Sequence, residues 1–185
     1  MSLRLWTAGR PAVHFSSYHL VRSPSIVHIQ LLCVGKLKEK HFSAACAEYQ
    51  KRLGAFCKLT VTELPEARLP EHPTPTQVEG ALAREGEALL AKLPKSTKVI
   101  ALCVEGVQLS SPALAAQLEQ WMVEGASHLT LIIGGSFGLH PSVKEAAHLR
   151  LSMSPMTFPH HLARVMVLEQ VYRAFQIAAG TRYHK

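Results

Sequence analysis

The chain alternates short apolar runs with longer segments whose apolar residues recur at helical spacing. The runs are rich in β-branched and aliphatic residues, which is typical of strands buried in a parallel sheet. Glycine, proline and polar residues separate them from the segments that follow. The expected strands are VHIQLLCV (27–34), CKLTVTEL (57–64), KVIALCV (98–104), HLTLII (128–133) and a short LRLSM (149–153).

The segments between these runs carry the signals of helices. Between residues 38 and 56, apolar side chains recur every three or four positions and define one face of an amphipathic helix. Thr76, with Glu79 three residues later, predicts a helix that begins with a capping box. Ser111 followed by Pro112 predicts another helix start. The expected helices are 38–56, 76–93, 112–125, 141–147 and 160–179.

Strands that alternate with helices predict an α/β fold with a mainly parallel sheet and helices on both of its faces. We expect a single domain over residues 27–185. Residues 1–26 differ, because they contain arginine, serine and histidine but no acidic residue. This composition fits an organellar targeting segment, an extension foreign to the native protein, or translation that begins at Val27. We expect this segment to be disordered.

The net charge of the chain indicates which kinds of binding partner to expect. The 185 residues carry a formal net charge of +7, from 20 Lys and Arg against 13 acidic residues. Every acidic residue is glutamate, which excludes an Asp-containing catalytic triad and an Asp-x-Asp metal loop. Net positive charge favours an anionic partner such as nucleic acid, although an ordinary basic protein shows the same balance. No apolar run reaches the ~18 residues that cross a bilayer, so we expect no membrane segment.

Cysteine and histidine form no metal-binding motif. The four cysteines contain no Cys-x-x-Cys pair, and His160 and His161 are adjacent, so they point apart on a helix. We therefore expect no metal site.

Two glycine-containing turns follow expected strands, LCVEG (102–106) and IIGGSFG (132–138). Parallel sheets bind ligands beyond the carboxyl ends of their strands, and glycine lets a ligand approach the backbone closely. The glycine spacing is not that of a dinucleotide fingerprint. A ligand site and a plain tight turn both agree with these residues.

The stretch LSMSPMTFPHH (151–161) has no periodicity and is too apolar for a solvated loop. We expect Met153, Met156 and Phe158 to need burial. Such a loop wraps a ligand or packs as a connector between elements. Its hydroxyl and main-chain groups suit the polar edge of a base, while its apolar side chains suit a flat ring.

The expected last helix is apolar around most of its circumference, so we expect burial on more than one side, as at a subunit interface. Glu169 and Arg173 on this helix are four residues apart and also fit a simple ion pair. The tail TRYHK (181–185) is dense in groups that contact phosphates and bases. A terminal pentapeptide is, alternatively, often a frayed end.

Six motifs stand in the order and at the separations of one bacterial enzyme family: LLCVGK, IALCVEG, LIIGGSFGL, LSMSPMTFPHHLARV, LEQVYRA and the terminal YHK. From Val27 to its end, the chain resembles the large-subunit rRNA methyltransferase H family. The resemblance implies an enzyme that uses S-adenosylmethionine to methylate N3 of a pseudouridine in 23S rRNA, and we expect the assembled ribosome to be its substrate. A non-catalytic ribosome- or RNA-binding protein of the same fold is the alternative.

The same resemblance implies a SPOUT fold with a C-terminal trefoil knot, and a homodimer with cofactor pockets near the subunit interface. We expect a cytoplasmic protein, or one of an organelle matrix if residues 1–26 are a transit peptide. The residues that match cofactor-binding positions are Leu102, Gly134, Gly135, Ser154, Pro155, Met156, Thr157, Phe158 and Pro159.

The catalytic group that we expect comprises His184, Tyr183 and Arg164. We infer that His184 removes the N3 proton, because an imidazole titrates near working pH. Tyr183 stacks on or orients the base in this hypothesis. Phosphates are held by positively charged side chains: Arg164, Arg173, Arg182 and Lys185.

Overall fold

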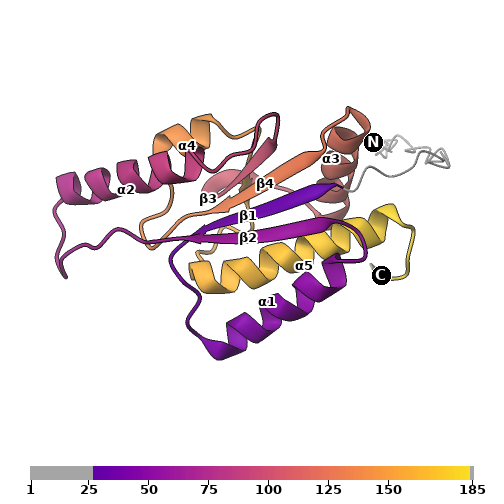
Figure 1. Ribbon diagram of the computed structural model, residues 1–185, viewed down its shortest axis with the longest axis horizontal. Helices are drawn as coiled ribbons and strands as arrows, with labels where there is room; N and C mark the ends of the chain where they lie inside the picture. Colours follow the sequence, from indigo (N-terminus) through magenta and orange to yellow (C-terminus); the bar gives the residue numbers. More distant parts are fainter. Residues whose placement is uncertain (1–26, 184–185) are drawn as a thin grey trace, which may run out of the picture.

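The computed structural model describes residues 27–183 and shows one five-stranded sheet with the order β2-β1-β4-β3-β5. Every neighbouring pair of strands is parallel, so the prediction of an α/β fold with a parallel sheet is confirmed. Figure 1 shows the strands side by side with helices above and below them. In chain order the elements are β1 (His28–Val34), α1 (Lys40–Leu53), β2 (Lys58–Leu64), α2 (Pro75–Leu90), β3 (Lys98–Gln108), α3 (Ser111–Val123), β4 (His128–Ile133), α4 (Pro141–Glu145), β5 (Leu149–Ser152) and α5 (His160–Ala178).

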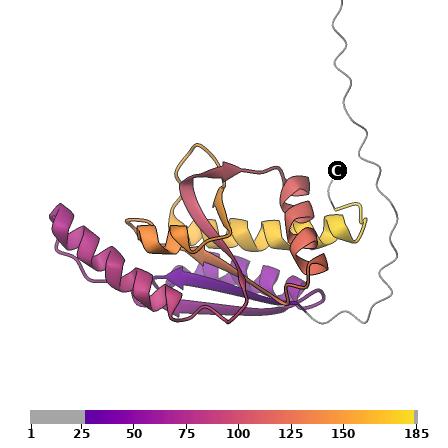
Figure 2. The ribbon, with the colours of Figure 1, turned by 90° about the horizontal axis from the view of Figure 1, so that it is seen from above.

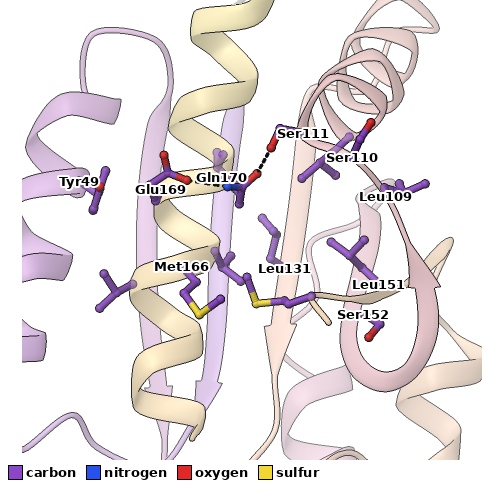
Figure 3. Close-up of a pocket in the computed structure, with 15 residues that line it drawn as sticks. Tyr49, Leu109, Ser110, Ser111, Leu131, Leu151, Ser152, Met166, Glu169 and Gln170 are labelled. Carbon is purple, nitrogen blue, oxygen red and sulfur yellow. Dashed lines mark hydrogen bonds between the residues drawn. The ribbon is translucent and has the colours of Figure 1, made fainter. Parts of the chain in front are cut away.

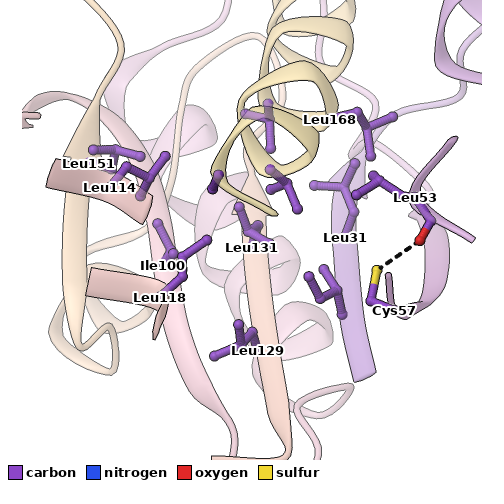
Figure 4. Close-up of a cluster of buried hydrophobic side chains, with 14 of the residues drawn as sticks. Leu31, Leu53, Cys57, Ile100, Leu114, Leu118, Leu129, Leu131, Leu151 and Leu168 are labelled. Atoms are coloured by element: carbon purple, nitrogen blue, oxygen red, sulfur yellow. Dashed lines mark hydrogen bonds between the residues drawn. The ribbon is translucent and has the colours of Figure 1, made fainter. Parts of the chain in front are cut away.

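Helices cover both faces of the sheet, as the alternation of elements predicts. Odd-numbered residues of β1, such as Leu31, pack with α1, α3 and α5 in the larger apolar cluster. Even-numbered residues, such as Leu32, pack with α2 and α4 in a smaller cluster on the other face. Figure 4 shows the larger cluster between α5 and the central strands. Full burial of each such aliphatic side chain contributes about 1.5–3 kcal/mol, so the central strands form a rigid base for the loops at their ends.

Two helix starts differ from those that the sequence predicts. Helix α2 is capped by Thr74, whose hydroxyl accepts a hydrogen bond from the Gln77 amide at 3.3 Å. The Gln77 side chain accepts one from the Thr74 amide at 2.8 Å, so this pair forms the capping box in place of Thr76 and Glu79. Helix α3 is capped by Ser110, one residue before the predicted Ser111.

Strand β3 continues four residues beyond its predicted end at Val104. Leu102 and Val107 both lie opposite Leu151 of β5, so the intervening residues bulge out of the sheet. Gly106 allows this close return, because a Cβ atom there would lie 2.7 Å from the backbone of Arg150. The bulge projects from the sheet at the place where β3 and β5 end.

Helix α5 runs back along the sheet, antiparallel to the strands and between α1 and α3 (Figures 1 and 2). Its first two turns lie at the carboxyl edge of the sheet, where Arg164 contacts the carbonyls at the end of β1. Its last turns lie at the amino edge, where Phe175 stacks on Phe56 just before β2. The 19 residues of α5 span ~28 Å at about 1.5 Å per residue, so its two ends lie at opposite edges of the sheet.

The predicted extension at residues 1–26 lies outside the described residues. Within residues 27–183, no helix is both long enough and apolar enough to cross a membrane.

Candidate functional site

Three of the predicted cofactor-binding segments meet at the carboxyl edge of the sheet. The Gly134–Gly135 turn follows β4, and the loop 154–159 follows β5. Leu102 lies within β3 and pairs with Ile133, the last residue of β4. These strands are neighbours in the order β4-β3-β5, and their parallel direction brings their ends to one edge. This is the edge at which open parallel sheets bind ligands.

The turn after β4 is closed upon itself and requires glycine. A Cβ atom on Gly134 would lie 2.1 Å from the carbonyl oxygen of Gly138, which no real side chain tolerates. The Gly138 amide donates to the Gly135 carbonyl at 3.1 Å, and Gly138 has a φ of +87°. Backbone therefore packs directly against backbone in this turn, and a side chain at Gly134 would disrupt it.

A carboxylate that the sequence did not point to holds this turn. Oxygen Oε1 of Glu66 accepts hydrogen bonds from the Ser136 amide at 2.9 Å and from the Ser136 hydroxyl at 2.7 Å. The hydrogen bond from the Ser136 amide lowers the pKa of Glu66 below its usual range, against the smaller opposing effect of partial burial. Glu66 is therefore ionised at neutral pH and fixes the outer end of the turn.

The loop after β5 is organised by its serines. The Ser154 hydroxyl accepts from the Met156 amide at 3.0 Å, and the Ser152 hydroxyl donates to the Ser154 carbonyl at 2.9 Å. Met153 and Phe158 are half-buried, as the composition predicts. Met156 is 70% exposed, against that prediction, because the turn at Ser154 directs residues 155–157 outward.

Arg164 lies deep in the protein, with 2% of its surface exposed. One guanidinium nitrogen, Nη1, donates to Glu63 at 2.7 Å, and the other, Nη2, donates to the carbonyls of Val34 and Gly35 at 2.8 Å each. Glu63 also accepts from the Leu37 amide at 2.8 Å. The guanidinium faces protein groups and offers no surface to RNA, so we assign Arg164 a structural role in place of a phosphate contact or a catalytic one.

A second group of polar residues, here called the tail cluster, comprises Glu169, Arg173 and Tyr183. Arg173 forms the expected ion pair with Glu169 at 2.6 Å. The Tyr183 hydroxyl donates to the same Glu169 oxygen at 3.3 Å, and the Arg173 guanidinium lies 4.8 Å from the Tyr183 ring centroid. Partial burial and the nearby Glu169 charge raise the pKa of Tyr183. The ion pair is therefore one part of an arrangement that also orients the tail.

Three further tail residues are predicted to act on the RNA, namely Arg182, His184 and Lys185. Arg182 is exposed at the end of the described chain. His184 and Lys185 lie outside the described residues, so their predicted roles have no structural account.

An apolar groove of about 560 Å³ runs beside α5 (Figure 3). Leu151 and Met153 form its wall near the carboxyl-edge loops, and Met166 lines it on α5. Gln170 lies on the same helix, where it accepts from the Ser111 hydroxyl at 2.7 Å and donates to Glu169 at 2.7 Å. The groove thus extends from the loop after β5 to the tail cluster.

Metal-ligand geometry is not found in the described part of the chain. Among residues 27–183, no three His, Cys or Glu side chains are grouped so that they could hold a metal ion.

The parallel sheet carries its glycine and loop segments at the edge where open α/β sheets bind their ligands. The family model described as Predicted SPOUT methyltransferase matches residues 27–184, and the chain belongs to this family. It is accordingly a methyltransferase.

The sequence is also similar to a named member of this class. Ribosomal RNA large subunit methyltransferase H of Bifidobacterium animalis subsp. lactis (strain AD011) is 47% identical over 159 residues, which cover 86% of this chain and 100% of the relative. Among solved structures, a protein of the methylase family from Neisseria gonorrhoeae superposes with a TM-score of 0.53 at 14% identity. That match covers 89% of each chain and agrees with the fold.

Proposed function

We propose that this enzyme uses S-adenosylmethionine to methylate N3 of a pseudouridine in large-subunit rRNA, on the assembled ribosome. The name of the bacterial relative and the net charge of +7 support an rRNA substrate. The observation that carries the proposal is the meeting of Leu102, the Gly134–Gly135 turn and the loop 154–159 at one edge of the sheet. A bacterial relative also supports a cytoplasmic location.

The groups at this edge fit an adenosine. The close packing at Gly134 and Gly135 holds the turn in one shape, and its backbone N–H and C=O groups suit hydrogen bonds to a purine or a ribose. Met156 and Phe137 are 70% and 52% exposed, although both are apolar, and they suit contact with a flat ring. When bound, S-adenosylmethionine supplies a methyl group already activated on a sulfonium. The protein then aligns the reacting atoms, which lowers barriers by up to about 7–11 kcal/mol in favourable cases.

The tail cluster supplies the groups that the base requires. Glu169 orients both Arg173 and Tyr183, so the aromatic ring and the guanidinium are held together before RNA binds. In the proposed reaction Tyr183 orients the pseudouridine, and His184 accepts the proton from N3. Positively charged groups then hold the neighbouring phosphates: Arg173, Arg182 and Lys185.

The separation of these two regions supports a homodimer. The loop 154–159 precedes α5, and Tyr183 follows it. The helix is ~28 Å long, so the loop and Tyr183 lie at its opposite ends. A second copy seated on the groove beside α5 would place the tail of one subunit at the cofactor edge of the other. Apolar groove residues such as Met166 and Leu151 suit such a contact. We include the trefoil knot in this proposal, on the strength of the SPOUT family match.

Calorimetry and a methylation assay test the proposal together. We expect the full chain to bind S-adenosylmethionine, and to methylate intact ribosomal large subunits or 70S ribosomes faster than naked 23S rRNA. Deletion of residues 181–185 should reduce RNA methylation about 100-fold or more and leave cofactor affinity largely intact. Absence of cofactor binding by the full chain would contradict the enzyme mechanism, whereas loss of cofactor binding upon tail deletion would show that the tail is structural.

A further inference from the structure

Two carboxylates near the end of β2 reach different parts of the carboxyl edge. Glu63 lies within β2 and binds Arg164 of α5 at 2.7 Å as well as the Leu37 amide at 2.8 Å. Glu66 lies two residues after the strand and binds Ser136 through both its amide and its hydroxyl. One carboxylate therefore contacts the helix that follows the loop 154–159, and the other contacts the turn that follows β4.

We propose that Glu63 and Glu66 are positioning residues, which set the separation of the two halves of the cofactor site. This inference rests on the proposed function, because it takes the Gly134–Gly135 turn and the loop 154–159 to be those halves. Two strands, β1 and β4, separate β2 from β3, and the carboxylates of β2 do not need to touch the cofactor. They act through the backbone groups that they hold.

The contact of Glu66 with the turn is close enough to fix it. A Cβ atom on Gly135 would lie 2.9 Å from Oε1 of Glu66, so the carboxylate fills the space beside the glycine backbone. Hydrogen bonds to an ionised acceptor are about twice as strong as neutral ones, and a turn held by two of them loses much of its freedom before the ligand binds. Pre-ordering of this kind raises affinity, because binding then costs less conformational entropy.

The contact of Glu63 with α5 is equally direct. Arg164 stands in the second turn of the helix, five residues after Pro159, the last residue of the loop. Its hydrogen bonds to Val34 and Gly35 tie the start of α5 to β1, and Glu63 supplies the opposite charge. Movement of Glu63 would therefore release the helix start and, with it, the loop.

Substitution of Glu66 tests the proposal on the full chain. We expect Glu66→Ala to raise the Kd for S-adenosylmethionine about tenfold in calorimetry, and to raise KM for the cofactor similarly. Because the reacting groups are unchanged, kcat at saturating cofactor should stay within about twofold of wild type. Glu66→Gln keeps an acceptor for Ser136 and should recover most of the affinity. Glu71→Ala is the matched control, since it removes the same charge from an exposed position of the same segment.

A double-mutant cycle shows whether the effect passes through the turn. Ser136→Ala removes the hydroxyl donor, and its effect on Kd should largely vanish in the Glu66→Ala background. Full additivity of the two changes would overturn the proposal, as would a Glu66→Ala chain with wild-type affinity. A fall in kcat with unchanged KM would also overturn it, because that pattern belongs to a catalytic group. Absence of cofactor binding by wild type would instead refute the proposed function.

The Glu63→Gln variant tests the second half of the proposal, the role of Glu63. It keeps the shape of the side chain but weakens the pairing with Arg164, and we expect the cofactor Kd to rise about threefold or more with kcat largely retained. The variant is compared at a temperature well below its unfolding midpoint, which circular dichroism measures. A folded Glu63→Gln chain with unchanged cofactor affinity would overturn the role of Glu63.

Discussion

Each end of α5 carries an arginine paired with a glutamate, but the two arginines lie in opposite settings. Near its start, Arg164 is 2% exposed and binds Glu63 together with two backbone carbonyls. Near its end, Arg173 pairs with Glu169 four residues earlier, and its side chain remains 26% exposed. A buried guanidinium whose two terminal nitrogens bind protein groups holds the fold together, whereas a partly exposed one beside an aromatic ring retains a surface for a ligand.

Replacement of each arginine by methionine gives the largest expected difference. Arg164→Met should lower the free energy of unfolding by about 3–5 kcal/mol, because it leaves the carbonyls of Val34 and Gly35 without a donor. Arg173→Met should cost less than about 1 kcal/mol, since its ion pair is accessible to water. Urea unfolding at equal protein concentration measures both. Similar losses for the two variants would remove the distinction between the ends of the helix.

His184→Ala tests the chemical side of the same comparison. If the tail acts on the base, the single-turnover rate of methylation should fall about 100-fold, which is the scale of lost general-base catalysis. The free energy of unfolding and the cofactor Kd should stay close to those of wild type. Tyr183→Phe is the companion variant, because it removes only the hydroxyl that donates a hydrogen bond to Glu169. A near-wild-type rate for His184→Ala would refute its role as base.

A mixing experiment tests whether the two ends of α5 meet across subunits. One chain lacks residues 181–185, and the other carries Gly134→Val, which clashes with Gly138 in the turn. Each chain alone should be inactive. After equimolar mixing and exchange, half of the dimers are mixed and one of their two sites is intact, so activity should return to about a quarter of wild type. Activity that stays at background would show that each tail serves its own chain.

Local signals in the sequence predict the elements well, but they leave some choices open. Thr74-x-x-Gln77 and Thr76-x-x-Glu79 both fit a capping box, and Pro75 decides between them because proline favours the first helical position. The outward turn at Ser154 exposes Met156 through hydrogen bonds within the loop, which hydrophobicity does not reveal.

Contacts between distant segments do not follow from local patterns in the sequence. Glu66 and Ser136 are 70 residues apart, and Glu63 and Arg164 are 101 apart. Their pairing depends on the order of strands in the sheet, which places β2 beside β1 and brings α5 back across both. The sequence predicts that Arg164 lies on the last helix as a positively charged residue. It does not predict that Arg164 is buried, and this burial changes its role.

Glu66 is exposed, whereas Arg164 is buried and Arg173 is half-buried, so Glu66 gives the smallest expected effect. Because hydrogen bonds from Ser136 lower its pKa in the folded protein, its contribution to stability is fully present above the unfolded pKa of about 4.5. That contribution is lost as pH falls through the lower folded pKa. The difference in unfolding free energy between wild type and Glu66→Gln should therefore stay constant from about pH 7 to about pH 5 and shrink at lower pH. Thermal unfolding across this pH range measures the difference. In a Ser136→Ala background, the pH at which the difference begins to shrink should move toward the unfolded pKa, because one hydrogen bond to Glu66 is missing. A difference that grows as pH falls would mean that the carboxylate is destabilised by the turn, so that the turn is held by other groups.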